Sequence, residues 1–471
     1  MRIGDIVQFD KSRYFGGAIQ ANWFYDSTKV KAIVESYVFH GPKYHGVEAS
    51  ETRNHSYKLY DTASYALKLI DSIESNNNNH LFLTIAGYGT GKSHLAVTLA
   101  ALFSGHSDEL RAAAIERIAN ADKDIAAKIS AHSEKNLVLV LNGMNNFNLD
   151  SEFLSVAKMA LEQHGISSDT ALKEVTKQYD QAKHFVKVTY DVYKDKYERH
   201  CNGIDKQVLI DSIESNEKLF NAVNEVYKEI NGEYMRWDSG ISAGVILSLL
   251  DRKFCKEKKI FKRIIVLFDE FGRFIEYAAA HPQIAGDSAL QQIFEAIQNA
   301  DGDILFNGFI QYDLKQYLNH VGSSSNIERY VGRYDQSEKL YISSNFETIL
   351  ANLLTKKNDQ SFKAIVETNV DVLNATYNSN VHNVLLRWDK RTSSRSVWVK
   401  NDMYMSVVAK GCYPLHPLTV WLLSNTSEWM QQRSTIAFAS QMFDSVKDTD
   451  VSAKWLDYVY AVDVIDSDLF N

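Results

Sequence analysis

The sequence contains few cysteines, few prolines and no long apolar run. Three cysteines in 471 residues, at positions 201, 255 and 412, are far apart and include no C-x-x-C pair. This pattern favours a reducing cytoplasm and argues against a thiol-based metal site. The amino-terminal residues do not follow the basic-then-apolar order of a signal peptide, and no apolar run reaches the roughly 20 residues of a membrane span. We therefore expect a cytoplasmic protein with no membrane segment.

The composition limits the classes of ligand. The chain carries a formal net charge of −8, which argues against wholesale coating of nucleic acid but leaves room for a local basic patch. Its 14 histidines show no H-E-x-x-H or comparable spacing, so no zinc site is expected. With 45% hydrophobic residues, a chain of this length can bury a large core, divided between about two or three domains.

The segment 81–95 is the most informative part of the sequence. An apolar strand is followed by a glycine-rich loop, and Gly-Lys-Ser then opens a helix. Glycines in the loop let backbone N–H groups converge on phosphate oxygens, and the helix N-terminus adds partial positive charge. Lys92 would reach the phosphates, and the Ser93 hydroxyl would bind Mg²⁺. The first glycine of the usual G-x-x-x-x-G-K-[ST] pattern is replaced by Ala86, which ends the strand. We expect the nucleotide to be held by Gly87, Tyr88, Gly89, Thr90, Gly91, Lys92, Ser93 and His94.

A second apolar strand, 264–268, ends in two carboxylates, Asp269 and Glu270. Ligands of parallel α/β sheets lie at the carboxyl ends of the strands, which would place Asp269 beside the phosphates. We expect Asp269 to hold Mg²⁺, and Glu270 to orient and deprotonate the attacking water. Asp269 lies much further from Lys92 along the chain than the roughly 30 residues of one βαβ unit, so an insertion must separate the two motifs.

Two further positions are candidates for catalysis, and each has a structural alternative. Gln311 follows a predicted strand at 303–310 and would contact the γ-phosphate from beside the acidic strand; it could equally cap its own strand. Arg329 and Arg333 follow. Either could be an arginine finger that reaches the nucleotide of a neighbouring subunit, with Arg333 taken as the candidate, or could form a surface salt bridge.

The remaining sequence predicts an α/β fold with helical additions. We expect residues 1–56 to form a strand-containing lead-in, because 3–9 and 30–39 alternate weakly between apolar and polar residues. The P-loop core would cover 57–344, with a helical insertion at about 166–250, and 345–471 would form a helical C-terminal region. Core strands are predicted at 81–86, 136–141, 264–268 and 303–310, and helices at 57–74, 92–104, 108–133, 150–163 and 345–355.

Four segments together resemble one family, in the order 87–95, 268–274, 332–334 and 413–418. The pattern is similar to the AAA+/STAND-type P-loop ATPases of bacterial anti-phage defence islands, in particular those of the BREX and Pgl phage-exclusion systems. The resemblance spans about 80 to 440 and implies an AAA+-like parallel-sheet core, a helical lid and ATP as the nucleotide. It also implies a lid residue that meets the nucleotide, for which His416 and Arg433 are candidates. The alternative for His416 is a structural histidine whose hydrogen bonds are satisfied within its own turn.

These observations predict an Mg²⁺-dependent ATPase whose nucleotide state controls assembly, or the activity of a partner effector, in antiviral defence. The partners would be further copies of the chain, an effector encoded nearby, or both. A slow-hydrolysing nucleotide switch and a DNA-stimulated motor are the alternatives. Contact with nucleic acid stays open, because seven Lys and Arg residues between 252 and 263 would fit DNA phosphates but are also typical of a solvated helix end.

Overall fold

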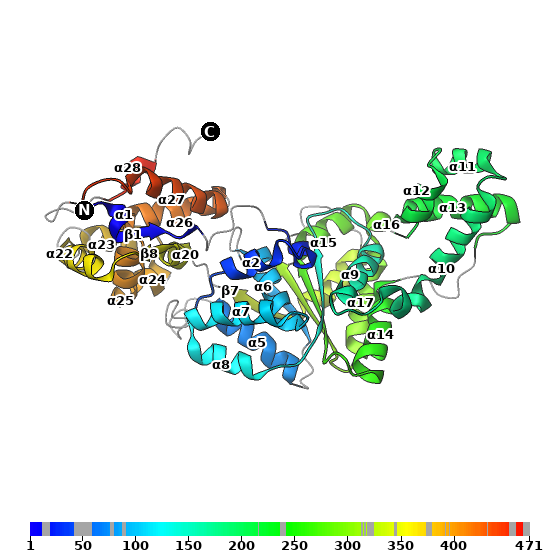
Figure 1. The fold of residues 1–471 in the computed structure, drawn as a ribbon, viewed down its shortest axis with the longest axis horizontal. Coiled ribbons are helices and arrows are strands. Elements are labelled where there is room, and N and C mark those ends of the chain that lie inside the picture. The colour runs from blue at the N-terminus through cyan, green and yellow to red at the C-terminus, as the bar shows by residue number, and fades with distance from the viewer. Residues whose placement is uncertain are drawn as a thin grey trace.

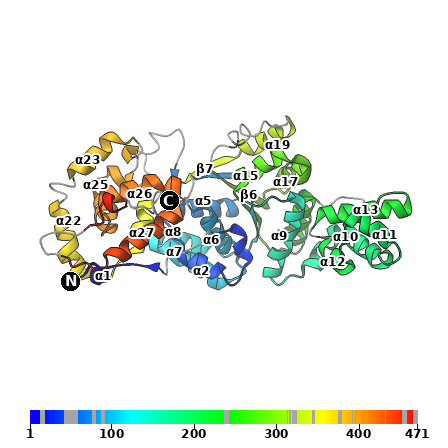
Figure 2. The same cartoon turned by 90° about the horizontal axis from the view of Figure 1, so that it is seen from above.

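The protein is elongated, and three regions follow one another along its long axis (Figures 1 and 2). A central parallel sheet with helices on both faces lies between a helical projection, built by α10 to α13, and a mainly helical C-terminal lobe. The computed structural model describes all residues except 12–18, 42–58, 76–79, 87–90, 215, 236–241, 312–313, 315–316, 318–324, 343–345, 374–378, 391, 395, 431, 452–457 and 465–471.

The central sheet has six parallel strands in the order β2-β7-β3-β6-β5-β4. The four core strands expected from the sequence are present within one residue at each end, and the α/β class is confirmed. β7 and β2 extend the sheet beyond β3 and were not predicted. The strands are β2 (Leu59–Tyr60), β3 (Leu81–Ile85), β4 (Leu137–Asn142), β5 (Ile264–Asp269), β6 (Ile304–Ile310) and β7 (Glu338–Ile342).

Both faces of the sheet are buried, because β4, β5 and β6 are mainly apolar and their alternate residues enter different cores. Val138 and Val140 pack with the helices of one face, whereas Leu139 and Leu141 pack with those of the other. The first face is covered by α2 (Val30–Ser36), α5 (Thr62–Glu74), α6 (Lys92–Ser104), α7 (Asp108–Ala121) and α8 (Lys123–Ala131). The second is covered by α9 (Leu149–Gln163), α14 (Ala243–Leu250), α15 (Phe271–Ala280), α17 (Asp287–Asn299) and α19 (Ser325–Asp335).

The predicted helices of the core end where capping residues stop them. The Ala-rich segment 108–133 is two helices rather than one, because Asp122 ends α7. The Asp122 carboxylate then accepts hydrogen bonds from the backbone N–H groups of Asp124 and Ile125 in the first turn of α8. Gly105 ends α6 with a positive φ of 64°. Residues 30–36, which we expected to be extended, form α2 instead, because Val30, Ile33 and Val34 are spaced to bury one helical face.

The described residues between 166 and 250 are mainly helical, with short turns between the helices. α10 (Ser168–Thr189), α11 (Lys194–Cys201), α12 (Lys206–Ser212) and α13 (Glu217–Asn231) extend away from the sheet in both views (Figures 1 and 2). α14 differs, because it packs against α17 and α9 and belongs to the core. Gly244 permits this packing: a Cβ at that position would lie 2.6 Å from the backbone oxygen of Gln292.

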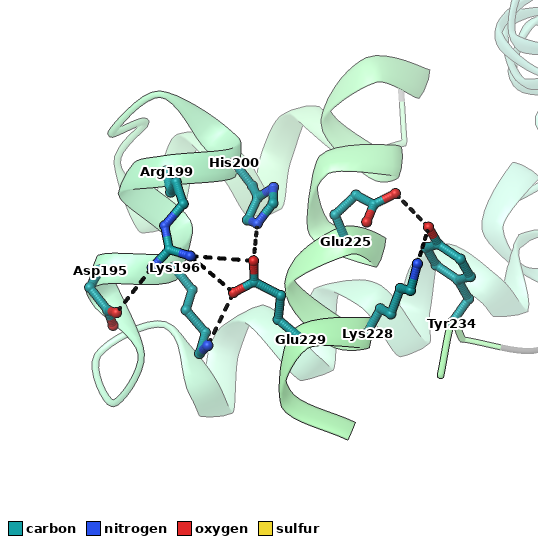
Figure 3. A network of polar contacts seen from close by, with 8 residues as sticks. All are labelled: Asp195, Lys196, Arg199, His200, Glu225, Lys228, Glu229 and Tyr234. Carbon is teal, nitrogen blue, oxygen red and sulfur yellow. Dashed lines mark hydrogen bonds and ion pairs between the residues drawn. The ribbon is translucent and has the colours of Figure 1, made fainter. Parts of the chain in front are cut away.

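An ion-pair network joins α11 to α13 in the projection (Figure 3). The Glu229 carboxylate of α13 accepts hydrogen bonds from Lys196, Arg199 and His200 of α11, at 3.1, 3.4 and 2.8 Å. The hydrogen bonds from His200 and Lys196 lower the pKa of Glu229 to about 2. One carboxylate thus holds three side chains of the neighbouring helix, and α11 keeps a defined position beside α13.

The chain's first described residues belong to the C-terminal lobe. After α1 (Ile3–Ile6), β1 (Val7–Phe9) pairs antiparallel with β8 (Leu354–Lys356), and its apolar side chains enter the core of that lobe. Residues 19–39 instead pack on the sheet. The described part of the predicted lead-in 1–56 is therefore divided between two hydrophobic cores. The lobe continues with α20 (Phe346–Leu353), α22 (Thr368–Leu373), α23 (Ser379–Trp388), α24 (Ser396–Val399), α26 (Pro417–Met430) and α27 (Gln432–Val446).

Helices long and apolar enough to cross a lipid bilayer are absent from the part of the chain that the structure describes.

Candidate functional site

The residues singled out in the sequence meet at the carboxyl edge of the central sheet. Lys92 and Ser93 open α6, which follows β3, while Asp269 ends β5. β6 lies between these two strands, and Gln311 comes directly after it. In a parallel sheet, the carboxyl ends of neighbouring strands share one edge, which is the usual position of ligands in open α/β folds. The predicted residues of three separate segments are therefore adjacent.

Lys92 is a buried cation at this edge, with 6% of its side chain exposed. Its Nζ donates a hydrogen bond to the carbonyl oxygen of Ala86 at 3.2 Å. Burial lowers the pKa of Lys92, and the negative charges of Glu270 and Asp269 oppose that shift. Gly91, which precedes it, has a φ of 80° that other residues rarely adopt. The predicted phosphate-binding residues Gly87, Tyr88, Gly89 and Thr90 lie outside the described residues.

Asp269 is 1% exposed and hydrogen-bonds the hydroxyl of Ser93. Its second acceptor is unsatisfied: Oδ1 is buried and has no hydrogen-bond partner among the described residues. Burial, and next the charge of Glu270, raise the pKa of Asp269 to about 6, while Ser93 and Lys92 act in the opposite direction. A buried carboxylate oxygen without a partner costs free energy, so a partner from outside the described residues would stabilise this atom.

Glu270 stands beside Asp269 with a constrained backbone and a constrained side chain. Its φ of 51° lies in the left-handed region, which is uncommon for a residue with a side chain. Gln311 Nε2 lies 3.3 and 3.4 Å from the two carboxylate oxygens of Glu270. Arg273, one turn into α15, places its Nε 3.8 Å from Oε2. The carboxylate is consequently held from two sides.

Two glycines, Gly143 and Gly272, allow close contacts between the segments at this edge of the sheet. A Cβ at Gly143, just after β4, would overlap the carbonyl oxygen of Glu270, and the Gly143 N–H donates to the carbonyl of Asp269 at 2.8 Å. A Cβ at Gly272 would overlap the ring of Tyr317, whose hydroxyl accepts the N–H of Gln311 at 2.8 Å. Glycine at these two positions lets neighbouring segments approach closely enough to support both carboxylates.

A buried cycle of hydrogen bonds lies beneath the edge. Thr84 of β3 donates to Asn307 Oδ1 of β6 at 2.7 Å, and Asn307 Nδ2 donates to the Tyr65 hydroxyl at 2.8 Å. The Tyr65 and Thr84 hydroxyls are 2.6 Å apart, which closes the ring. All three side chains are fully buried. The cycle ties β3 and β6 to α5, and Gln311 directly follows β6.

Sequence reasoning did not identify Arg273, Tyr317, Asn307 or Tyr65 as supporting residues. Of these, only Asn307 could have been singled out from the sequence, because it is a polar residue in the middle of an otherwise apolar run. The contacts of Tyr317 and Tyr65 depend on how distant segments are placed, and no local pattern encodes that. Arg273 is only three residues from Glu270, and its contact depends on the left-handed turn at Glu270.

Three of the residues considered from the sequence contact neighbouring side chains or backbone instead. His94 directs its Nε2 to the carbonyl oxygen of Ile33 in α2, 2.7 Å away, and packs edge-on against Tyr37. Arg333 of α19 pairs with Glu295 of α17 at 3.7 Å, which is the salt-bridge alternative considered for it. Arg329 is exposed and lies over the ring of Tyr330.

His416 belongs to the core of the C-terminal lobe. It is 4% exposed, packs against Tyr458 and Tyr460, and accepts the N–H of Leu418 on Nδ1 at 3.2 Å. Burial lowers the pKa of His416 to about 4. This arrangement matches the alternative considered from the sequence, in which the hydrogen bonds of His416 are satisfied within its own turn. Arg433 lies in α27, and its side chain is outside the described part of the structure.

The basic residues between 252 and 263 are largely engaged with their own chain. Lys253 donates to the carbonyl of Ala171 at 2.9 Å, and Lys256 pairs with Asp251 at 2.9 Å. Arg263 is buried and bonds the carbonyl of Ile73 at 2.9 Å. This cluster therefore fits the solvated or packed helix end better than a nucleic-acid surface.

Comparisons with protein-family models and with curated proteins find no match to this chain.

Proposed function

We propose that the chain binds a nucleoside triphosphate, preferentially ATP, together with Mg²⁺ at the carboxyl edge of β3, β5 and β6, and hydrolyses it. The single observation that carries the proposal is the buried Asp269 carboxylate, with Oδ1 unpartnered among the described residues and the Ser93 hydroxyl beside it. The buried ammonium of Lys92 lies at the same edge. A hard cation and a polyphosphate are the ligands that suit this set of groups.

The donor set fits Mg²⁺. This ion prefers oxygen ligands and is usually held by one or two protein groups, with water and phosphate oxygens completing its shell. Asp269 and Ser93 would be those protein groups. Mg²⁺, when bound, supplies neutralisation of the phosphate charge. Occupation of Asp269 Oδ1 would also remove the cost of its unsatisfied burial.

Four residues of the chain would bind the phosphates, accept the proton of water and orient the base. Lys92 would bind the phosphate oxygens as a point charge at the start of α6. Glu270 would accept the proton of the attacking water on a carboxylate oxygen, since water is a poor nucleophile until a base takes that proton. Gln311 would orient Glu270 through the two contacts described above, and Arg273 would support it from the α15 side.

A slow switch is the second candidate, and one observation favours it. Glu270 is held by Gln311 and Arg273 at once, so it must leave at least one partner if it is to move toward a substrate. Such a restraint would slow hydrolysis until a partner relieved it. Control of a partner effector in antiviral defence remains the wider proposal, and it rests on the resemblance of the sequence motifs alone.

Binding of ATPγS measured by calorimetry with and without Mg²⁺ tests the proposal. Lys92→Ala should abolish detectable binding, and Ser93→Ala and Asp269→Asn should remove its Mg²⁺ dependence. Two matched controls should bind normally: Lys128→Ala, an exposed lysine on α8, and Ser72→Ala on α5, whose hydroxyl bonds only within its own helix turn, to Lys68. Normal binding by Lys92→Ala would refute the site.

Turnover measurements separate the two candidates. An ATPase that cycles freely should release phosphate at a constant rate from the first turnover. A switch should show a burst of about one phosphate per chain, followed by trapped ADP. Stimulation by DNA would instead support a motor.

A further inference from the structure

Trp388, the last residue of α23, is the most exposed of the large hydrophobic side chains that the structure describes, at 72%. Tryptophan is usually well buried in folded proteins, so this degree of exposure is unusual. α23 lies at the periphery of the C-terminal lobe in Figure 2. One turn earlier on the same helix, Val384 is 60% exposed. The end of α23 therefore presents a largely uncovered aromatic ring.

The ring is backed on one side by a second tryptophan. The centroids of Trp388 and Trp421 are 5.5 Å apart, with the rings inclined at 38°. Trp421 of α26 is itself fixed, because its Nε1 donates to Asp389 Oδ2 at 3.1 Å and to Thr392 Oγ1 at 2.9 Å. Trp388 consequently rests on a rigid neighbour while most of its surface stays open. A ring supported in this way loses little conformational freedom when a flat ligand stacks on it.

The surrounding sequence is cationic, although the whole chain is acidic. The fourteen residues 387–400 contain five Lys and Arg and one acid, in a chain with a formal charge of −8. The acid, Asp389, accepts hydrogen bonds from Trp421 and Thr392. Arg387 and Lys390, on either side of Trp388, are both exposed and form no ion pair with a described residue. Of the other three cations, Arg391 and Arg395 lie outside the described residues and Lys400 is half-buried.

We propose that Trp388, Arg387 and Lys390 form a binding surface for single-stranded nucleic acid. Proteins that bind single strands without sequence preference combine aromatic rings, on which bases stack, with cations that follow the phosphates. This surface offers both groups within four consecutive residues. It is separate from the carboxyl edge of the sheet, and it does not depend on ATP binding.

A protein partner is the competing occupant, because tryptophan and arginine are also frequent at the centres of protein interfaces. The charge favours nucleic acid. The core of a protein–protein interface is depleted of charged residues, whereas Trp388 is flanked by two solvated cations and by a segment with a clear excess of positive charge. A polyanion with exposed bases satisfies the cations and the ring together.

Fluorescence anisotropy of a labelled 20-nucleotide oligothymidine tests the proposal with the full chain, without ATP and at low salt. Trp388→Ala should weaken binding by about 5- to 150-fold, the range expected for loss of one stacked base. Trp388→Phe should retain most of the affinity. The double variant Arg387→Ala, Lys390→Ala should reduce the slope of log affinity against log salt by about 1.4, since each lost phosphate contact contributes about 0.7 for a single strand.

Matched controls come from the same lobe. Val372→Ala removes another exposed apolar side chain, at 64% exposure, and Lys363→Ala removes another exposed cation; neither should change the affinity. The proposal is overturned if the wild-type chain does not bind the oligonucleotide, or if Trp388→Ala binds it as well as the wild type does. It is also overturned if Trp388→Ala alters only self-association, measured by sedimentation, because the surface would then be a protein interface.

Discussion

Gln311 and Glu270 face each other across the carboxyl ends of β6 and β5, with Gln311 Nε2 3.3 Å from one carboxylate oxygen and 3.4 Å from the other. Contact with both oxygens fixes the plane of the carboxylate as well as its position. The backbone N–H of Gln311 is in turn held by the Tyr317 hydroxyl. Because β6 lies between β3 and β5, this pair links the end of β5, which carries Asp269, to the end of β6, the neighbour of β3.

Replacing the Glu270 carboxylate should separate binding from hydrolysis. Glu270→Gln keeps the size of the side chain and removes its ability to accept a proton. We expect nucleotide affinity within about threefold of the wild type and turnover lower by about 10²- to 10⁴-fold, the usual contribution of a general base. Phosphate release and ATPγS binding measured on the same preparation decide the outcome. Loss of binding would show that Glu270 holds the nucleotide rather than activating water.

The Gln311 contact should contribute to turnover through orientation. In Gln311→Ala the carboxylate of Glu270 loses its amide partner, and a misplaced group of this kind costs about 10- to 100-fold in rate. Gln291→Ala is a matched control, since its amide donates to the Glu295 carboxylate at 2.7 Å on the exposed side of α17. The control should turn over normally. A higher rate in Gln311→Ala would mean that the contact restrains Glu270, as the switch candidate requires.

The close approach of Gly272 and Tyr317 should be sensitive to a single methyl group. A Cβ at Gly272 would overlap the Tyr317 ring, so Gly272→Ala must displace the ring and weaken its bond to Gln311. We expect a loss of about 1–3 kcal/mol in unfolding free energy together with reduced turnover. Gly332→Ala on α19 is the control, because a Cβ there meets no atom within 4 Å. It should be neutral or slightly stabilising in denaturant titrations.

The parts of the fold that could be predicted are those with a strong local signal. β4, β5 and β6 are mainly apolar runs, with Asn307 the polar exception within β6, and their limits were predicted within one residue. β7 was missed because Glu338 and Lys339 open it with two charged residues, which pair with Lys68 and Asp335 respectively. The helical spacing of α2 was present in the sequence, but alternation over a few residues was given more weight.

Within the candidate site, too, the residues with a local sequence signal could be predicted and those without one could not. Lys92, Ser93, Asp269 and Glu270 stand in motifs whose chemistry depends on residue order, so they could be selected from the sequence. Their support by distant residues, such as Tyr317 and Tyr65, could not, because it depends on how separate segments pack. The ion pair of Arg333 with Glu295 likewise required knowledge of how α19 lies against α17.

The buried cycle beneath the site should make the Tyr65 hydroxyl important for stability. Tyr65→Phe leaves Asn307 Nδ2 without its acceptor and Thr84 without one of its two partners, in a fully buried position. We expect a loss of about 1–3 kcal/mol in unfolding free energy. Tyr404→Phe provides the contrast, because the Tyr404 hydroxyl is buried with no hydrogen-bond partner among the described residues. Its removal should be neutral or stabilising by up to about 1 kcal/mol, and equal effects of the two changes would contradict the argument.

His416 should make the stability of the C-terminal lobe fall in mild acid. Burial lowers the pKa of His416 to about 4 from its usual 6.5, so the unfolded chain takes up a proton below pH 6.5 that the folded chain refuses. The stabilisation is therefore complete above about pH 6.5 and is lost as the pH falls toward 4, by about 3 kcal/mol for this group. His416→Asn removes the titration while its side-chain oxygen can still accept the N–H of Leu418. Unfolding free energies of wild type and variant, measured between pH 7.5 and 4, should differ in slope over this window. Parallel curves would show that other buried histidines dominate the acid sensitivity and that His416 is protonated at little cost.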